Sequence, residues 1–345
     1  MIWVLAFALL MVVIFNFVGF SISSPKYSGP RTDHFNGKTF ENPGDVKAKG
    51  LTDVIKWASN RKRQPWIVEK EPYIGPEPAG QVKAGIKITF VNHSTFLIQA
   101  NGMNILTDPV WSDRTSPFRF AGPKRMRPPG ITFEDLPKID LVIISHNHYD
   151  HLDVSTMRDL IKHHNPGIIT PLGVGEFVRK MGTDNVEDLD WWQEQVISDD
   201  MNIVCVPAQH FSGRGTFDRD ATLWCGYIIQ SKSGNIYFAG DSGYGDFFKL
   251  IGEKYGKMKV SMIPIGAYLP QWFMSPIHIS PEEAVKVHQD VNSEISIAMH
   301  YGTFPLADDG QQQPILDLKD AINRSGLNKD EFVLLDEGKS LVLKD

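Results

Sequence analysis

The stretch Ile144-Ser145-His146-Asn147-His148-Tyr149-Asp150-His151-Leu152 decides how the rest of the chain is interpreted. It follows an apolar, β-branched run, which predicts a buried strand that ends in a polar turn. On extended backbone, residues two apart share a face, so His146 and His148 can bind one cation together. Asp150 and His151 follow where the chain turns and can serve a second cation. A solvated, His-rich loop is the alternative, but four ligand residues within six positions favour a metal site.

The composition is that of an ordinary globular protein. The chain has 345 residues, of which 42% are apolar and 22% charged, enough for one large α/β domain or two smaller ones. Its net charge of −6, with histidine neutral, argues against nucleic acid as a partner. Cys205 and Cys225 both lie in strand-like apolar runs and predict buried thiols. The 11 histidines are therefore the metal-binding resource of this chain.

The first residues raise the question of a membrane. Residues 2–20 contain no charged side chain and are about as long as a helix needs to be to cross a hydrocarbon core. A secretory signal is the competing interpretation, but no basic residue precedes the apolar run and residues 21–25 show no clear cleavage pattern. We therefore expect residues 1–22 to form a single-pass membrane anchor or an uncleaved signal. Lys26 and Arg31 follow it, which favours the cytoplasm for the domain but leaves the side of the membrane open.

The remainder is expected to divide into two parts. Residues 23–80 form a linker and an N-terminal wrapping segment, with a helix at 51–60 and extended, proline-containing chain at 65–78. Residues 81–345 form the catalytic domain, in which strand and helix patterns alternate as in a layered α/β fold. Strands are predicted at residues 87–91, 95–98, 103–106, 141–144, 168–170, 203–206, 227–229, 236–239 and 295–299. Helices are predicted at residues 154–161, 174–180 and 281–289.

Three distant residues share the context of the opening motif. His210, Asp241 and His300 each follow an apolar strand-like run. Since strand ends at one edge of a sheet converge, these residues are predicted to complete the site. One consistent assignment gives metal one to His146, His148 and His210, metal two to Asp150, His151 and His300, and makes Asp241 a bridge between them.

The ligand chemistry predicts a catalytic centre. His and carboxylate ligands suit zinc best, with iron or manganese as alternatives. Two such metals about 3.5–4 Å apart can hold a bridging water as hydroxide and clamp the oxygens of a displacement. Asp108 lies at a strand end just before a proline, where it either orients a ligand imidazole or forms a simple turn.

These residues together resemble a known family. Residues 145–153, with the later His210, Asp241 and His300, are similar to the metallo-β-lactamase fold, and most similar to N-acylphosphatidylethanolamine-hydrolysing phospholipases D. The resemblance to these phospholipases covers most of the chain from about residue 42. The short strings that are most specific to them lie at residues 106–109, 122–125, 189–192, 207–210, 238–241, 263–268, 271–274 and 281–284. The chain departs from the family at Asn92 and at residues 211–213.

The resemblance implies a four-layer αββα sandwich, two zinc ions and hydrolysis of a glycerophospholipid on the headgroup side of its phosphate. It implies that Tyr149 and His278 contact the substrate. For the reaction we expect an in-line displacement at phosphorus in which Asp150 or Asp241 orients the attacking hydroxide. The products would be phosphatidate and an N-acylethanolamine.

The expected partner is a membrane phospholipid, and a homodimer is a further expectation. Residues 268–279 are rich in aromatic and apolar side chains, which predicts lipid contact at the headgroup–acyl boundary, a groove for acyl chains, or packing on the sheet. Other hydrolases of this fold, such as a lactonase or a soluble phosphodiesterase, are the alternatives. A third hypothesis is a metal-dependent lipid-binding or redox protein on the same fold.

Overall fold

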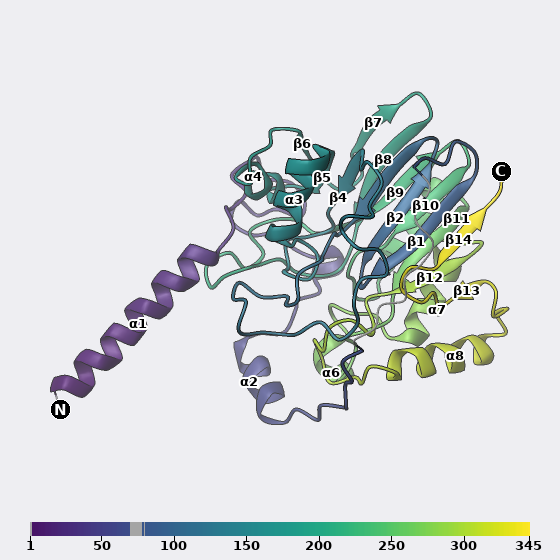
Figure 1. The fold of residues 1–345 in the computed structure, drawn as a ribbon. Coiled ribbons are helices and arrows are strands. Elements are labelled where there is room, and N and C mark those ends of the chain that lie inside the picture. The colour runs from purple at the N-terminus through teal and green to yellow at the C-terminus, as the bar shows by residue number, and fades with distance from the viewer. Residues whose placement is uncertain (1, 70–77, 79) are drawn as a thin grey trace.

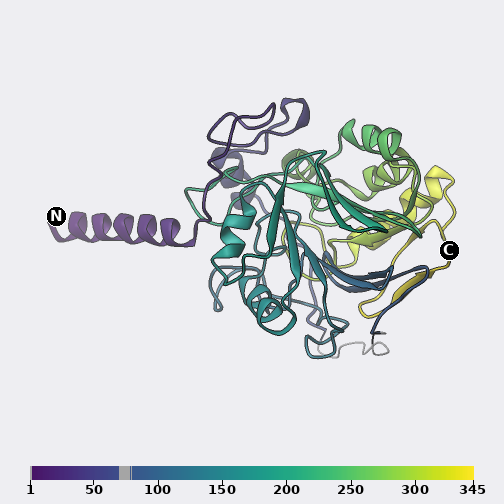
Figure 2. The same cartoon turned by 90° about the horizontal axis from the view of Figure 1, so that it is seen from above.

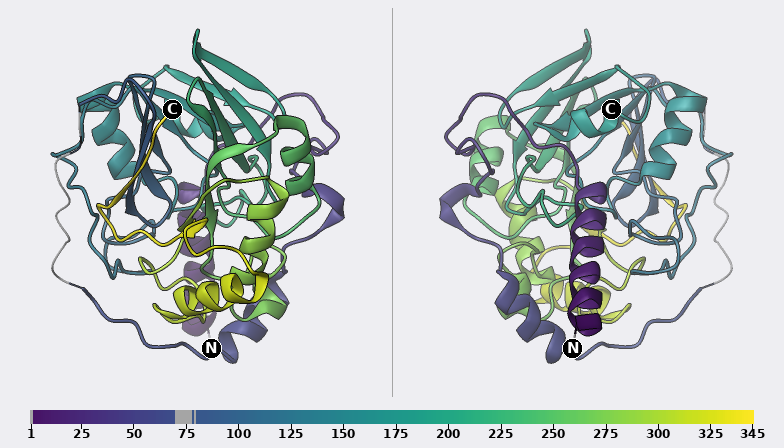
Figure 3. Two further views of the ribbon diagram at one scale, coloured as in Figure 1. Left: turned by 90° about the vertical axis from the view of Figure 1, so that its right-hand side faces the viewer. Right: turned by 90° about the vertical axis from the view of Figure 1, so that its left-hand side faces the viewer.

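Two seven-stranded sheets lie face to face between two layers of helices (Figures 1 and 3). The computed structural model describes residues 2–69, 78 and 80–345. The αββα architecture predicted from the sequence is therefore confirmed. Both sheets are mixed, with antiparallel and parallel neighbours.

The first sheet has the order β14-β1-β2-β3-β4-β5-β6. Its strands β1 to β3 are joined by antiparallel pairs, and β3 to β6 run parallel. The strands are β1 (Ile86–Asn92), β2 (Thr95–Ala100), β3 (Met103–Thr107), β4 (Leu141–Ile143), β5 (Gly167–Pro171), β6 (Val186–Leu189) and β14 (Ser340–Leu343).

The second sheet has the order β13-β12-β11-β10-β9-β8-β7. Strands β7 to β10 pair antiparallel, and β10 to β13 pair parallel. The strands are β7 (Glu194–Ser198), β8 (Met201–Pro207), β9 (Cys225–Ser231), β10 (Gly234–Phe238), β11 (Met258–Pro264), β12 (Ser296–Met299) and β13 (Phe332–Val333).

Helices cover both outer faces of this pair of sheets. On the first sheet, Met157 and Leu160 of α3 (Val154–His164) and Val174 of α4 (Val174–Arg179) pack on the strands. On the second sheet, α5 (Phe247–Tyr255), α7 (Pro281–Asp290) and α8 (Gln313–Ser325) contribute buried residues to the core. The short α6 (Gln271–Met274) lies below the sheets (Figure 1).

Alternating side chains explain the layers. Phe90 and Phe96 point between the sheets, whereas their neighbours Val91 and Leu97 belong to the cluster under α3 and α4. Because successive residues of a strand point to opposite faces, strands buried on both sides must be apolar throughout. Asp153 begins α3 as the sequence predicted: its side chain accepts a hydrogen bond from the backbone N–H of Ser155 at 3.1 Å.

The N-terminal residues form the helix α1 (Ile2–Ile22), which projects away from the sheets (Figures 1 and 2). Its large apolar side chains are exposed, with Trp3 at 86% and Phe20 at 72%. Among the residues that the structure describes, however, no helix meets the length and apolarity required to cross a membrane. The predicted single-pass, membrane-spanning helix is therefore not supported, although the predicted helix is present.

The segment after α1 crosses the outside of the domain. It contains a turn of 3₁₀ helix (Pro43–Asp45) and the helix α2 (Leu51–Ser59), close to the predicted 51–60. No residue of α2 is buried. Most of the extended chain predicted at 65–78 falls on residues 70–77, which lie outside the described residues.

Candidate metal centre

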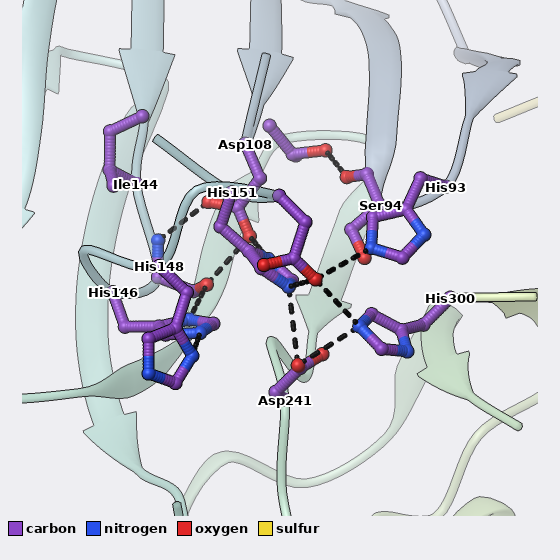
Figure 4. A network of polar contacts seen from close by, with 12 residues as sticks. His93, Ser94, Asp108, Ile144, His146, His148, His151, Asp241 and His300 are labelled. Atoms are coloured by element: carbon purple, nitrogen blue, oxygen red, sulfur yellow. Dashed lines mark hydrogen bonds and ion pairs between the residues drawn. The ribbon is translucent and has the colours of Figure 1, made fainter. Parts of the chain in front are cut away.

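The predicted metal ligands lie together at one edge of the sheets, where strands end (Figure 4). The motif follows β4, while His210, Asp241 and His300 follow β8, β10 and β12. These loops meet because each leaves the same end of its strand. Gly240 makes this approach possible at Asp241. It has φ +62°, and a Cβ there would come within 2.6 Å of the Cys225 carbonyl oxygen.

Three imidazoles form a first cluster. Nδ1 of His148 lies 2.8 Å from Nε2 of His146 and 3.2 Å from Nε2 of His210. The other ring nitrogens of His146 and His210 have hydrogen-bond partners in the protein. Nδ1 of His146 is 2.9 Å from the Ser145 hydroxyl, and Nδ1 of His210 is 2.9 Å from the Ile277 carbonyl oxygen. This support leaves three nitrogen atoms directed at one point.

A second cluster lies beside the first. The Oδ2 atom of Asp150 is 3.5 Å from Nε2 of His151 and 3.5 Å from Nε2 of His300. The Oδ2 atom of Asp241 is 3.2 Å and 3.0 Å from the same two nitrogens. It is also 3.8 Å from Nε2 of His210 in the first cluster. Asp241 therefore lies between the two clusters.

The spacing of these atoms fits bound cations. A tetrahedral cation with nitrogen and oxygen ligands at 2.0–2.2 Å holds those ligands about 3.3 Å apart. In addition, three buried atoms at the site have no hydrogen-bond partner among the described residues: Nδ1 of His300, Oδ1 of Asp241 and Nδ1 of His278. Because burying unpaired polar atoms is costly, the residues fit a metal centre.

The two clusters differ in their electrostatics. Burial, together with neighbouring imidazoles, lowers the pKa of His146 and His210 well below the usual value, and burial lowers that of His148 to about 3. These rings are therefore neutral at pH 7 and can offer lone pairs to a cation. Burial also opposes the charge of His300, but Asp241 and Asp150 outweigh it and raise the pKa to about 9.

The carboxylates of the second cluster are ionised. Burial alone would raise the pKa of Asp150 and of Asp241, but His151 and His300 hold both values well below the usual range. The imidazoles and carboxylates of the second cluster thus lie within ion-pair distance of one another.

Asp108 behaves as an orienting carboxylate. Its Oδ2 atom lies 2.6 Å from Nδ1 of His151, and its Oδ1 atom accepts a hydrogen bond from the backbone N–H of Ser145 at 2.7 Å. Of the two roles that the sequence allowed for Asp108, the geometry matches the orienting one.

The two predicted substrate residues lie in different places. His278 lies at the metal centre, with Nδ1 3.9 Å from Oδ2 of Asp241, and lines a cavity of about 270 Å³ together with His148, Asp150 and Asp241. Tyr149 points away from that cavity. Its hydroxyl donates to the Arg214 carbonyl oxygen at 2.9 Å, and it lines a separate cavity of about 700 Å³. Its contact with substrate stays a prediction.

His93 was missed from the sequence. It lies in the turn between β1 and β2 with φ +47°, and its Nε2 atom is 3.2 Å from Oδ2 of Asp150. Its carbonyl oxygen also accepts a hydrogen bond from the backbone N–H of His300 at 2.8 Å. The one feature of the sequence that could have indicated this role is its position at the end of a predicted strand, and a single His in such a position is weak evidence for a functional residue.

The apolar stretch at residues 268–279 packs on the domain. Tyr268, Phe273, Met274 and Ile277 are buried, and Trp272 is the one large apolar side chain of this stretch that is exposed, at 42%. Three of these buried residues, Phe273, Met274 and Ile277, form walls of the cavity at the metal centre. The predicted packing is thus observed for these side chains, and their place on the cavity wall is compatible with the predicted groove, whose use for acyl chains stays a prediction.

Fold and site together define the class of the protein. The family described as "Beta-lactamase superfamily domain" matches residues 103–301, and the chain belongs to this family. It is a metal-dependent hydrolase of the metallo-β-lactamase fold.

Particular relatives narrow the comparison. The chain is 36% identical over 332 residues to "N-acyl-phosphatidylethanolamine-hydrolyzing phospholipase D 1" of Caenorhabditis elegans, covering 88% of this chain and 92% of the relative. It is 29% identical over 258 residues to a UPF0173 metal-dependent hydrolase of Methanopyrus kandleri, covering 74% and 99%.

A solved structure shows the same fold. The metallo hydrolase Igni18 of Ignicoccus hospitalis aligns with a TM-score of 0.58 at 23% identity, covering 75% of this chain and 99% of that chain. At this level of identity the likeness concerns the fold alone.

Proposed function

We propose that this protein is a zinc-dependent phosphodiesterase that hydrolyses N-acylphosphatidylethanolamine to phosphatidate and an N-acylethanolamine. The observation that carries the proposal is a His and Asp cluster that opens directly into a cavity with apolar walls, Trp57, Phe273, Met274, Ile277 and Leu306. The similarity to a phospholipase D over 88% of the chain supports the lipid class.

Two zinc ions fit the two clusters. His146, His148 and His210 would hold one ion, Asp150, His151 and His300 the other, and Asp241 both. Nitrogen and oxygen ligands without thiolates are typical of catalytic zinc. When bound, such ions supply Lewis-acid activation of water and neutralise charge on the phosphoryl group.

The protein's own groups complete the reaction. Asp150 and Asp241 are ionised and accept hydrogen bonds from the attacking water, which orients it toward phosphorus. Burial, with smaller effects from neighbouring charges, lowers the pKa of His278 to about 4, so its neutral ring can donate an N–H to a phosphate oxygen. The bond from phosphorus to the ethanolamine oxygen breaks, and one proton of water ends on the alcohol product.

Contact with a lipid surface belongs to the proposal. The exposed apolar side chains of α1, such as Phe15 and Phe17, and of α2, Leu51 and Ile55, are suited to the boundary between headgroups and acyl chains. Val54 and Trp57 of α2 line the cavity at the metal centre, and α1 projects from the domain at the lower left of Figure 1. A substrate that resides in a bilayer would be met there.

Product analysis on vesicles tests the proposal. The full-length protein, zinc-loaded or chelated, is mixed with vesicles that contain several phospholipid headgroups and N-acylphosphatidylethanolamine. Phosphatidate and N-acylethanolamine should form only with metal, and Asp150→Asn should abolish both. Turnover of a lactone or a water-soluble diester in place of the lipid would favour the other hydrolases of this fold. Full activity of the chelated protein would overturn the proposal.

A further inference from the structure

A second cavity adjoins the one at the metal centre. The metal cavity, of about 270 Å³, has the apolar walls described above. The side cavity, of about 610 Å³, lies between residues 39–51 and the loop after His210. Six residues line both cavities: Ala48, Lys49, Val54, His210, Phe211 and Arg219. The two cavities are therefore neighbours on either side of a metal ligand.

Two positively charged side chains lie where the two cavities meet. Lys49 and Arg219 both line the two cavities. The Arg219 guanidinium stacks on Phe211 at 4.0 Å, and the Phe211 ring in turn packs on His148 with ring centroids 4.4 Å apart. The only acidic partner of Arg219 among the described residues is Asp220, at 3.4 Å, in an ion pair that is half exposed. Such a loosely paired guanidinium can bind a phosphate oxygen.

The walls of the two cavities differ in chemistry. Apart from the shared residues and the His and Asp side chains of the metal centre, the metal cavity is lined by apolar side chains, which suit one hydrocarbon chain. The side cavity combines apolar side chains with polar and charged ones: Phe40, Val46, Leu51 and Trp224, Thr39, Asn42 and Thr216, and Glu41, Lys47 and Asp220. Mixed walls of this kind suit a group that carries ester carbonyls as well as methylenes.

The side cavity also extends toward α1. Gly215 and Thr216, which line it, lie against the last turn of that helix, where the Ser23 hydroxyl donates to the Gly19 carbonyl oxygen at 2.7 Å. Phe217, next in the loop, is 41% exposed and donates its backbone N–H to the Ser23 hydroxyl at 3.3 Å. The end of this cavity is therefore close to the exposed apolar helix.

We infer that the two cavities divide a lipid diester between them: the side cavity binds the two-chain glycerol arm, the metal cavity binds the single N-acyl arm, and Lys49 and Arg219 bind the phosphate at the junction. This inference rests on the proposed function. The larger, mixed cavity receives the arm with two chains and two esters, and the smaller, apolar one receives the arm with one chain.

Two cavity-filling variants separate the arms. Val46 lines the side cavity and not the metal cavity, whereas Leu306 lines the metal cavity and not the side cavity. Val46→Trp and Leu306→Trp are assayed in mixed micelles with two substrate series, one varied in glycerol-chain length and one in N-acyl length. Val46→Trp should lower kcat/KM at least about tenfold for long glycerol chains and spare the dependence on N-acyl length, and Leu306→Trp should do the reverse.

Controls keep the test decisive. Val196→Trp, at a site on β7 that is 62% exposed, should leave both series unchanged. Val46→Phe replaces Val46→Trp if the larger side chain prevents folding, as judged by thermal melting and bound metal. Lys49→Gln and Arg219→Gln should lower kcat/KM for both series by the same factor.

The outcomes are distinct. If the wild-type protein hydrolyses neither series, the proposed function itself fails. If it hydrolyses both, but Val46→Trp affects the N-acyl series or affects both series equally, the division of the substrate is wrong and the proposed function stands.

Discussion

The Oδ2 atom of Asp108 lies 2.6 Å from Nδ1 of His151, and both side chains are fully buried. The same carboxylate oxygen accepts a hydrogen bond from the Ser145 hydroxyl at 2.6 Å, so two hydrogen bonds fix the side chain of Asp108 at a strand end. Because Nδ1 of His151 is committed to Asp108, Nε2 is left to face Asp150 and Asp241. One buried hydrogen bond thus sets which nitrogen of His151 can bind a metal.

Asp108→Asn should weaken metal binding. An amide cannot hold the imidazole of His151 as the carboxylate does, and loss of such a partner typically lowers affinity by about 10- to 100-fold. A zinc competition titration with a chromophoric chelator measures the change. Asp188→Asn is the control, because Asp188 is a hydrogen-bonded carboxylate of the first sheet that contacts Thr170 and Gly175. Equal affinities in both variants would contradict the role of Asp108.

His93→Ala should impair turnover while metal is retained. His93 holds Oδ2 of Asp150 at 3.2 Å and is not required as a ligand in our assignment. We expect kcat to fall roughly 10- to 100-fold, as for other partners of metal ligands. His93→Gln, which keeps a hydrogen-bond donor, should recover part of the loss. Metal content by mass spectrometry checks the premise: loss of an ion in His93→Ala would make His93 a ligand.

Tyr149→Phe distinguishes support of the metal loop from contact with substrate. The Tyr149 hydroxyl donates to Arg214, and the Arg214 guanidinium stacks on the Tyr149 ring at 3.9 Å and donates to the Asn147 carbonyl oxygen at 2.8 Å. Loss of the hydroxyl should cost about 0.5–1.5 kcal/mol of unfolding free energy and leave KM for the lipid unchanged. A severalfold rise in KM with unchanged stability would instead show that Tyr149 meets the substrate.

Asp218 should make stability depend on pH. Burial alone would raise the pKa of Asp218, but backbone N–H donors of Ser24, Arg214 and Gly215 hold it below the usual value. A carboxyl with a lowered folded pKa stabilises the protein above its unfolded pKa of about 4, and this stability is lost as pH falls through the folded value.

Asp218→Asn therefore should lower the free energy of unfolding by about 1–3 kcal/mol at neutral pH. The difference from wild type should shrink as the pH falls below about 4. Urea denaturation of both proteins across this range, with chelator present, provides the measurement. A difference that is constant with pH would show that the carboxylate charge is not involved.

The clustering of the predicted metal ligands could be foreseen because both their spacing and their position after apolar strands can be seen in the sequence. His146 and His148 are two residues apart after an apolar strand, and His210, Asp241 and His300 repeat the same strand-end position. Most of the strands and helices named from periodicity were observed with bounds shifted by one to a few residues. The pattern that signals a buried strand depends only on local sequence.

What was missed depends on contacts between distant residues. His93 is a single His in a hairpin turn, and only the fold brings it to Asp150. The burial of Phe273 arises from stacking on Trp57 at 4.9 Å, across more than two hundred residues. Strand β14 was not predicted either, because it completes the first sheet by pairing with β1 from the opposite end of the chain.

Side-chain direction within the motif was also beyond local reasoning. The resemblance implied that Tyr149 contacts the substrate, but local sequence does not tell which way its side chain points. In the structure its hydroxyl donates to the Arg214 carbonyl oxygen and its ring stacks on the Arg214 guanidinium, and contact with substrate stays a prediction. The two cavities beside the predicted metal ligands are likewise formed by segments near residues 48, 211 and 273, which are too far apart in the sequence to be seen together in a short window.

The central claim is that this metal-dependent hydrolase cleaves the headgroup side of a phospholipid by attack of water at phosphorus. The most direct test is hydrolysis of N-acylphosphatidylethanolamine by the zinc-loaded protein in ¹⁸O-labelled water, with both products analysed by mass spectrometry. We predict one labelled oxygen in phosphatidate and none in the N-acylethanolamine. Label in the N-acylethanolamine, or in a released fatty acid, would contradict the account.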